Sequence, residues 1–84
     1  MDMKMLVEKT LITSNGKQFS TYDDIAFTIL NAETNHLDRV IGRIVHLGDS
    51  SLVLDRVEID RFKSNPKTEY EFYYKDMDDV NYVA

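Results

Sequence analysis

The sequence contains no cysteine, a single proline and only three glycines among 84 residues. The lack of cysteine excludes disulfides and thiolate metal sites, so the fold must be stabilised by packing alone. Because proline and glycine are scarce and 43% of residues are apolar, the composition is typical of one globular domain spanning residues 1–84. No apolar run is long enough to cross a bilayer, and the start of the chain does not resemble a signal peptide. We therefore expect a cytoplasmic protein without a membrane partner.

Acidic residues outnumber basic residues by 15 to 10, which gives a net charge of −5. This balance disfavours general attraction to phosphate backbones or to anionic lipid. The charge is uneven, since residues 68–84 hold five acidic residues and one basic residue, whereas residues 36–67 hold five and six. All the arginines lie within residues 36–67.

Residues 37–62 contain two dense runs of β-branched and aliphatic residues on either side of a turn-rich stretch at 48–51. Such residues suit the pleated, half-buried surface of a sheet. We therefore predict a central β-hairpin with strands at about 38–47 and 51–61, and we expect the rest of the chain to be organised around it.

The second strand of this hairpin has a change of parity. Leu52 and Leu54 share one face, whereas Val57 and Ile59 fall on the other. A straight strand would have to bury both faces, so the pattern predicts a bulge or bend near residues 55–56.

Near the N-terminus, Asn15 and Gly16 form the strongest turn signal in the sequence, because both tolerate the positive φ angles of a two-residue type I′ turn. A turn at these two residues would place Ile12 opposite Phe19. The expected hairpin has strands at about 5–13 and 18–21, the first of which includes Ile12.

Residues 22–33 combine residue types that favour a strand with spacing that favours a helix. Thr21 stands in the N-cap position, and two aspartates would occupy the first turn. We therefore predict a helix at about 22–33, with a strand at 25–31 and a loop at 31–38 as the alternative. The helical stripe at i, i+3, i+4, i+7 and i+8 consists of Tyr22, Ile25, Ala26, Ile29 and Leu30.

Residues 68–75 alternate between aromatic and polar side chains, which predicts an antiparallel strand with one buried face. Tyr70, Phe72 and Tyr74 would lie on that face. The expected fold class is therefore α+β, mainly β. An N-terminal hairpin and one helix precede a three-stranded antiparallel meander, which forms a curved sheet or a small, partly open barrel.

A spaced pattern runs through the central hairpin at residues 40–55: Val40-x-Gly42-x-Ile44, then Asp49, then Leu52-x-Leu54-Asp55. This pattern resembles the second and third strands of Sm-like barrels, a kind of SH3-like small β-barrel. The family's Met-Asn pair is replaced by Ser50 and Ser51, and no Arg-Gly signature follows. The resemblance thus implies the barrel and not the family's RNA binding. Some acidic proteins of this fold inhibit enzymes that handle nucleic acids, which suits the negative C-terminal segment.

No constellation of residues indicates catalysis. His36 and His46 are too isolated to predict a metal site, and the acidic run at 76–79 lacks the glycine and the terminal glutamate of a calcium loop. Neither a nucleophile elbow nor a phosphate-binding glycine loop is present. We expect no enzyme, no metal and no cofactor.

We predict instead a small interaction module that binds another protein bearing a basic patch, as a regulator or inhibitor. The same acidic residues would also serve solubility alone. A third expectation is a structural subunit held in an assembly by an exposed edge strand. The predicted protein-binding residues are Glu69, Glu71, Tyr73, Asp76, Asp78 and Asp79.

The alternative is a nucleic-acid-binding barrel that uses a basic sheet face, with Tyr73 available for stacking. Interleaved acidic residues on the same strands also allow these cations to form cross-strand ion pairs instead. The residues of this alternative face are Arg39, Arg43, Arg56, Arg61 and Lys63.

Overall fold

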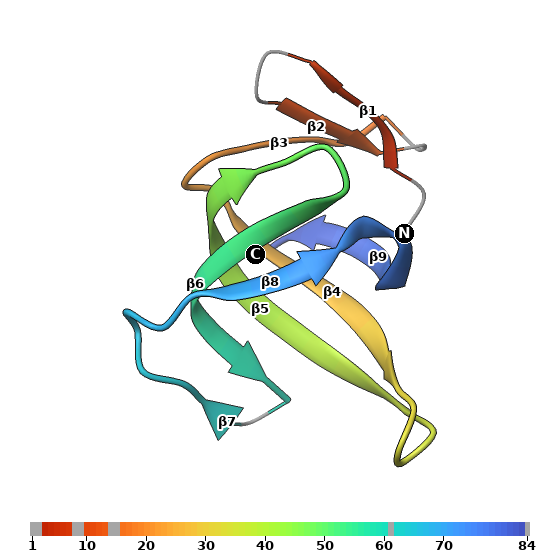
Figure 1. Cartoon of the computed structure of the whole chain (residues 1–84), viewed down its shortest axis with the longest axis vertical. Helices are drawn as coiled ribbons and strands as arrows, with labels where there is room; N and C mark the ends of the chain where they lie inside the picture. Colours follow the sequence, from red (N-terminus) through yellow and green to blue (C-terminus); the bar gives the residue numbers. More distant parts are fainter. Residues whose placement is uncertain (1–2, 8–9, 14–15, 61, 84) are drawn as a thin grey trace.

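The protein folds as two antiparallel sheets (Figure 1). The computed structural model describes residues 3–7, 10–13, 16–60 and 62–83. The first sheet has three strands in the order β1-β2-β3, and the second has six strands, with β7-β6-β5-β4-β9 as its path and β8 also paired with β6. The elements are β1 (Met3–Val7), β2 (Thr10–Thr13), β3 (Gln18–Ser20), β4 (Asp24–Asn31), β5 (His36–Leu47), β6 (Ser51–Ile59), β7 (Phe62–Lys63), β8 (Tyr70–Tyr73), the 3-10 helix η1 (Tyr74–Asp76) and β9 (Met77–Tyr82).

The hairpin of β5 and β6 forms the centre of the larger sheet, and the predicted reversal at 48–51 is confirmed. Leu47 pairs with Leu52, and the Gly48 N–H donates to the Ser51 carbonyl at 2.8 Å. Because both strands are rich in β-branched and aliphatic residues, they can bury one face each against the core. The hairpin has strand neighbours on both sides, with β4 beside β5 and with β7 and β8 beside β6.

The predicted bulge in the second strand of this hairpin is also confirmed. Ile41 pairs with Glu58 and Arg43 pairs with Asp55, so β6 has one residue more than β5 over this stretch. Arg56 takes up the extra residue with a positive φ of 52°. The bulge turns the side chains that follow it in β6 back toward the core. Leu52 and Leu54 before the bulge and Val57 after it are therefore all buried.

The predicted helix at 22–33 is wrong, because this segment forms β4. β4 is paired on both edges, with β5 and with β9, and the consecutive residues Ile25, Ala26 and Phe27 are all buried. Burial on both faces of a central strand erases the alternation that marks a half-buried strand. The resulting apolar run coincided with helical spacing, whereas its isoleucine, phenylalanine and threonine residues favour a strand.

The predicted α+β class with a three-stranded meander is therefore wrong as well. The segments expected at 38–47, 51–61 and 68–75 are β5, β6 and β8, but they belong to a six-stranded antiparallel sheet that also contains β4, β7 and β9. No α-helix occurs in the described residues, where η1 is the one helical element.

The small sheet covers one end of the larger sheet (Figure 1). Leu11 and Phe19 are fully buried and belong to the same core cluster as the strands of the larger sheet. The Phe19 ring lies 4.6 Å from that of Tyr82, whose hydroxyl donates to the Gln18 carbonyl. Lys17 also donates from its ammonium to the side-chain oxygen of Asn81.

The predicted N-terminal hairpin is wrong in two respects. The segment expected as one strand at 5–13 contains two strands, β1 and the β2 strand of the hairpin with β3, and β1 pairs with β2. The register is also shifted by one residue, because Leu11 and not Ile12 pairs with Phe19. The Gly16 N–H donates to the Thr13 carbonyl, the Thr13 N–H donates to the Lys17 carbonyl, and Gly16 has a φ of 85°. This pattern is typical of a turn closed by a glycine bulge, which shifts the strands relative to a two-residue turn. Asn15, one of the two predicted turn residues, lies outside the described residues.

Gly42 lets β5 and β6 approach closely in the core. A Cβ atom at this position would lie 3.0 Å from Leu54 Cδ1 and 3.2 Å from the Asp55 carbonyl oxygen. A side chain here would require Leu54 or the Asp55 backbone to shift, so the glycine allows Leu54 to pack closely against β5.

Candidate functional site

A groove of about 440 Å³ lies between β8, η1 and the ends of β4 and β9. We call it the β8–β4 groove. It is lined by Ile29 and Leu30 of β4, Glu71, Phe72 and Tyr73 of β8, Lys75 and Asp76 of η1, and Asp78 of β9.

The pairing of the strands explains why the groove exists. β8 pairs with β6, and η1 then carries the chain across to β9 on the far edge of β4. The pairing of β9 with β4 begins at Met77 and Ile29, so Leu30 lies beyond the ladder. An edge of β8 and the end of β4 thus face each other across a gap that the described strands do not fill.

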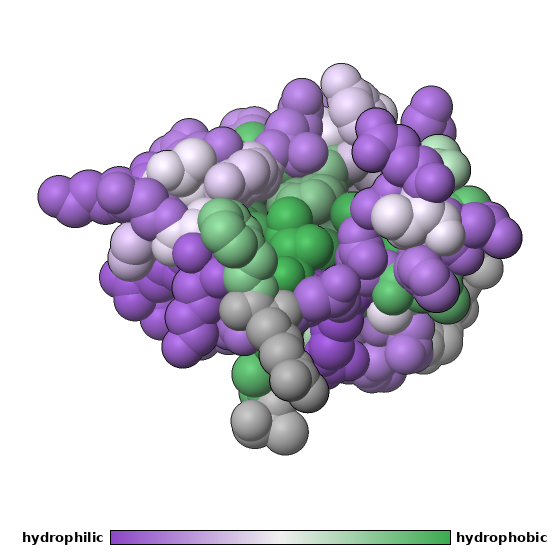
Figure 2. All heavy atoms as spheres, turned by 90° about the horizontal axis from the view of Figure 1, so that it is seen from below, coloured by the Kyte–Doolittle hydropathy of each residue, from purple (hydrophilic) through white to green (hydrophobic). Residues whose placement is uncertain are grey.

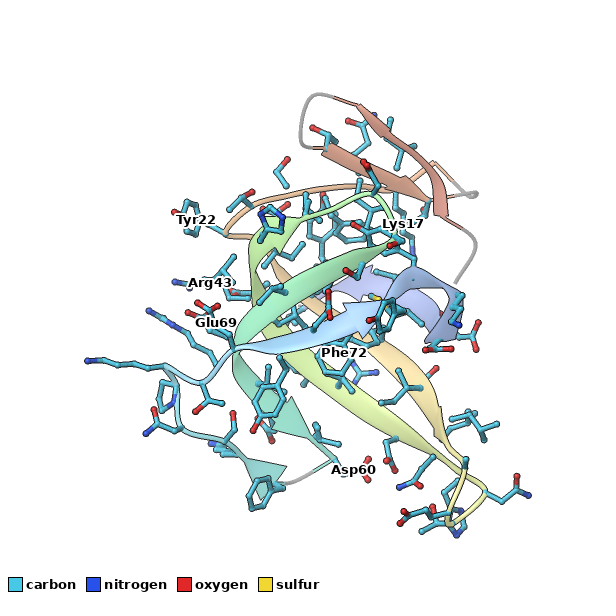
Figure 3. All side chains as sticks on the ribbon, in the orientation of Figure 1. Lys17, Tyr22, Arg43, Asp60, Glu69 and Phe72 are labelled. Atoms are coloured by element: carbon cyan, nitrogen blue, oxygen red, sulfur yellow. The ribbon has the colours of Figure 1, made fainter. Side chains whose placement is uncertain are left out.

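The floor of the groove is apolar. Phe72 is half-buried and meets the fully buried Phe27 edge to face, with ring centroids 5.2 Å apart. Ile29 is also half-buried against the core, whereas 59% of Leu30 is exposed. Phe72 points from β8 toward the end of the molecule opposite β1–β3 (Figure 3), and that end has an apolar hollow surrounded by polar side chains (Figure 2).

The rim of the groove is acidic. Glu71, Asp76 and Asp78 are exposed, and the Ser51 hydroxyl donates to the Glu71 carboxylate at 2.7 Å, which orients it. Tyr73 is 47% exposed, and the Lys75 ammonium lies 6.0 Å from the centre of its ring. Carboxylates around an apolar floor suit a ligand that combines positive charge with an apolar side chain.

The structure brings together four of the six residues predicted for protein binding, Glu71, Tyr73, Asp76 and Asp78. Glu69 precedes β8 and lies away from η1 (Figure 3). Asp79 does not line the groove either; it adopts a positive φ of 54° on β9 and accepts a hydrogen bond from the Asn81 amide.

Sequence reasoning missed the other lining residues, Ile29, Leu30, Phe72 and Lys75. Phe72 was assigned to a buried face, and the alternation at 68–75 supports that assignment because Phe72 is half-buried. Nothing in the sequence places Leu30 beside β8, because the two segments are some forty residues apart and meet only through the sheet.

Those residues of the predicted basic face that the structure describes do not form one open stripe. Arg43 donates from Nε to the Asp24 carboxylate at 3.1 Å, and this hydrogen bond and the charge of Asp24 hold the pKa of Arg43 above its ordinary value. Asp55 pairs with Arg43 across the strands and adds a second negative charge. Arg39 is exposed on β5.

Arg56 and Lys63 line a separate pocket of about 490 Å³ next to β7, in which Asp55 and Glu58 also lie. The pocket thus has charges of both signs. Arg61, the remaining member of the predicted face, lies outside the described residues.

Neither histidine belongs to a potential metal-binding group in the described part of the chain. His36 and His46 lie near opposite ends of β5, and none of the described histidines, aspartates and glutamates form a group of three that could hold a metal ion. Across the same residues, no helix has the length and apolar character needed to cross a membrane.

Comparisons of the chain with protein-family models, with curated proteins and with solved structures found no match. The resemblance to Sm-like barrels at residues 40–55 therefore stays a prediction. The function is therefore inferred from the geometry of the β8–β4 groove.

Proposed function

We propose that this protein is a small, non-enzymatic interaction module that binds another protein through the β8–β4 groove, as a regulator or inhibitor. The observation that carries the proposal is the groove itself. Four segments of the chain meet there and surround an apolar floor with three exposed carboxylates.

The groove chemistry defines the kind of partner. A basic surface would be attracted by Glu71, Asp76 and Asp78, and this attraction raises the association rate and selects against acidic proteins. An apolar side chain inserted between Leu30 and Phe72 would supply affinity, because their exposed apolar surface leaves water on binding. Since the chain has no cysteine, we expect the module to work in the reducing cytoplasm.

A pull-down from the native cells tests this proposal with two matched variants. The groove variant carries Asp76→Asn and Asp78→Asn, and the control variant carries Glu69→Gln and Asp79→Asn. Both remove two negative charges from the predicted acidic set, but only the first removes them from the groove. We expect the groove variant to lose the partner and the control variant to retain it.

Circular dichroism and thermal unfolding establish that both variants are folded before the pull-down. An unchanged set of partners for the groove variant would contradict the proposal. Equal losses for both variants would show that general negative charge, and not the groove, recruits the partner.

A further inference from the structure

The groove runs along the edge of a strand. Glu71, Phe72 and Tyr73 are consecutive residues whose side chains alternate between faces, yet all three line the groove. A cavity that is lined by residues from both faces of one strand must lie beside the edge of that strand. Among the described strands, β8 pairs with β6 alone, so its other edge has no strand partner.

Such an edge presents main-chain groups that can accept a further strand. In an antiparallel pair, every second residue directs its N–H and C=O away from the neighbour. Four β8 residues pair with β6, from Tyr70 opposite Leu54 to Tyr73 opposite Ser51, so the strand is regular along its length.

The opposite wall of the groove is also the end of a strand. Leu30 lies one residue beyond the last pair between β4 and β9, and η1 closes one end of the groove with Lys75 and Asp76. The larger sheet therefore has a strand-shaped gap between β8 and the end of β4.

We infer that the occupant of the β8–β4 groove is an extended segment of the partner protein, added as a strand to the free edge of β8, with basic and apolar residues in alternation. This inference rests on the proposed function and specifies its binding mode. Successive side chains of the added strand point to opposite faces. The apolar ones would contact Phe72 and Ile29, and the basic ones would meet Glu71, Asp76 and Asp78.

Main-chain pairing supplies affinity in this mode, whereas the alternating side chains supply specificity. A helical or globular ligand with the same charge would contact the carboxylates but would leave the edge of β8 without hydrogen bonds. The two cases therefore differ in their dependence on the ligand's own amide groups.

Three synthetic peptides test the inference on the full chain. The parent peptide alternates lysine and valine over seven residues and has blocked ends. The second is N-methylated at its valines and the third at its internal lysines, so that each loses the amide donors of one strand edge. Titrations followed by NMR give the affinities, and hydrogen exchange reports the protection of the β8 amides.

We expect the parent to bind and at least one N-methylated peptide to bind about tenfold or more weakly, since each lost hydrogen bond reduces affinity several-fold. Amides within residues 70–73 should become protected. The groove variant should bind the parent more weakly than the control variant does.

Equal affinities for all three peptides, or no binding of the parent, would overturn the inference; the pull-down decides the proposed function separately. Light scattering tests whether a second copy of the chain occupies the groove instead. A dimer that the Asp76→Asn and Asp78→Asn variant loses would also overturn the assignment to a partner's segment.

Discussion

The ring of Phe72 meets the ring of Phe27 at 76°, with 5.2 Å between the centroids. This edge-to-face contact joins the short edge strand β8 to the central strand β4, and it forms the floor of the β8–β4 groove. The stability of β8 and the shape of the groove therefore depend on the same pair of side chains.

The first prediction concerns this contact. Phe72→Ala should lower the free energy of unfolding by about 2–3 kcal/mol, because a half-buried ring and an aromatic pair are lost. The neighbouring Tyr73, exposed on the other face of β8, provides the control, and Tyr73→Ala should cost less than about 1 kcal/mol. Urea denaturation measures both. Equal costs would mean that Phe72 does not fasten β8 to the core.

A second prediction concerns Gly42. Replacing glycine by alanine within a strand ordinarily stabilises it by roughly 0.5–1 kcal/mol. Here the new Cβ would stand 3.0 Å from Leu54 Cδ1, so we expect Gly42→Ala to destabilise the protein by about 1–3 kcal/mol.

A double-mutant cycle with Leu54→Ala checks the cause, because the cost of Gly42→Ala should fall once the nearest atom is removed. A neutral or stabilising Gly42→Ala would contradict the close packing of β5 on β6.

A third prediction concerns pH. The Tyr74 side chain is buried and its hydroxyl donates to the Gly48 carbonyl at 2.8 Å, which ties η1 to the turn between β5 and β6. Burial, together with the negative charge of Asp49, raises the pKa of Tyr74 to about 12. In the unfolded chain the pKa returns to about 10.

Folding thus favours the neutral phenol of Tyr74. The stability that this group contributes is fully present below about pH 10 and is lost as the pH rises toward about 12. Denaturation curves from pH 8 to 11.5 should show this loss in the wild type and a smaller loss in Tyr74→Phe. At pH 8 the variant should be less stable by about 1 kcal/mol, from the lost hydrogen bond. Identical pH profiles would contradict the assignment.

A fourth prediction separates the proposed function from nucleic-acid binding. Because Arg43 is paired with Asp24, and Asp55 and Glu58 neighbour Arg56, we expect no retention of single-stranded RNA or DNA in gel shifts at low salt. Retention that weakens steeply with salt and disappears on Arg43→Gln and Arg56→Gln would favour the basic face instead.

The parts of the fold that the sequence predicted are those encoded by neighbouring residues. The reversal at 48–51, the bulge at Arg56 and the alternation from Tyr70 to Tyr74 all follow from local turn chemistry and parity. In β4, by contrast, burial of three successive residues follows from strands on both sides of it, which residues 22–33 alone do not reveal. Phe27 does not belong to the predicted helical stripe, and an apolar residue off the stripe speaks against a helix. It is fully buried in β4.

The groove was predictable in part for the same reason. The acidic and aromatic residues of 71–78 are near one another in sequence, so their clustering could be expected. The contribution of Leu30 could not, because it depends on where the pairing of β9 with β4 begins. Glu69 and Asp79 do not line the groove. Glu69 precedes β8, at the end of the strand away from η1, and Asp79 has a positive φ of 54° on β9.

Site-specific photocrosslinking in the native cells tests the partner-binding role of the groove most directly. A photoreactive phenylalanine analogue replaces Tyr73 in the groove or, as the control, Tyr22, which is 73% exposed and lies at the turn between β3 and β4 (Figure 3). We predict a discrete crosslinked partner from position 73 and none from position 22. A partner captured from position 22 and not from position 73 would contradict the assignment of the groove.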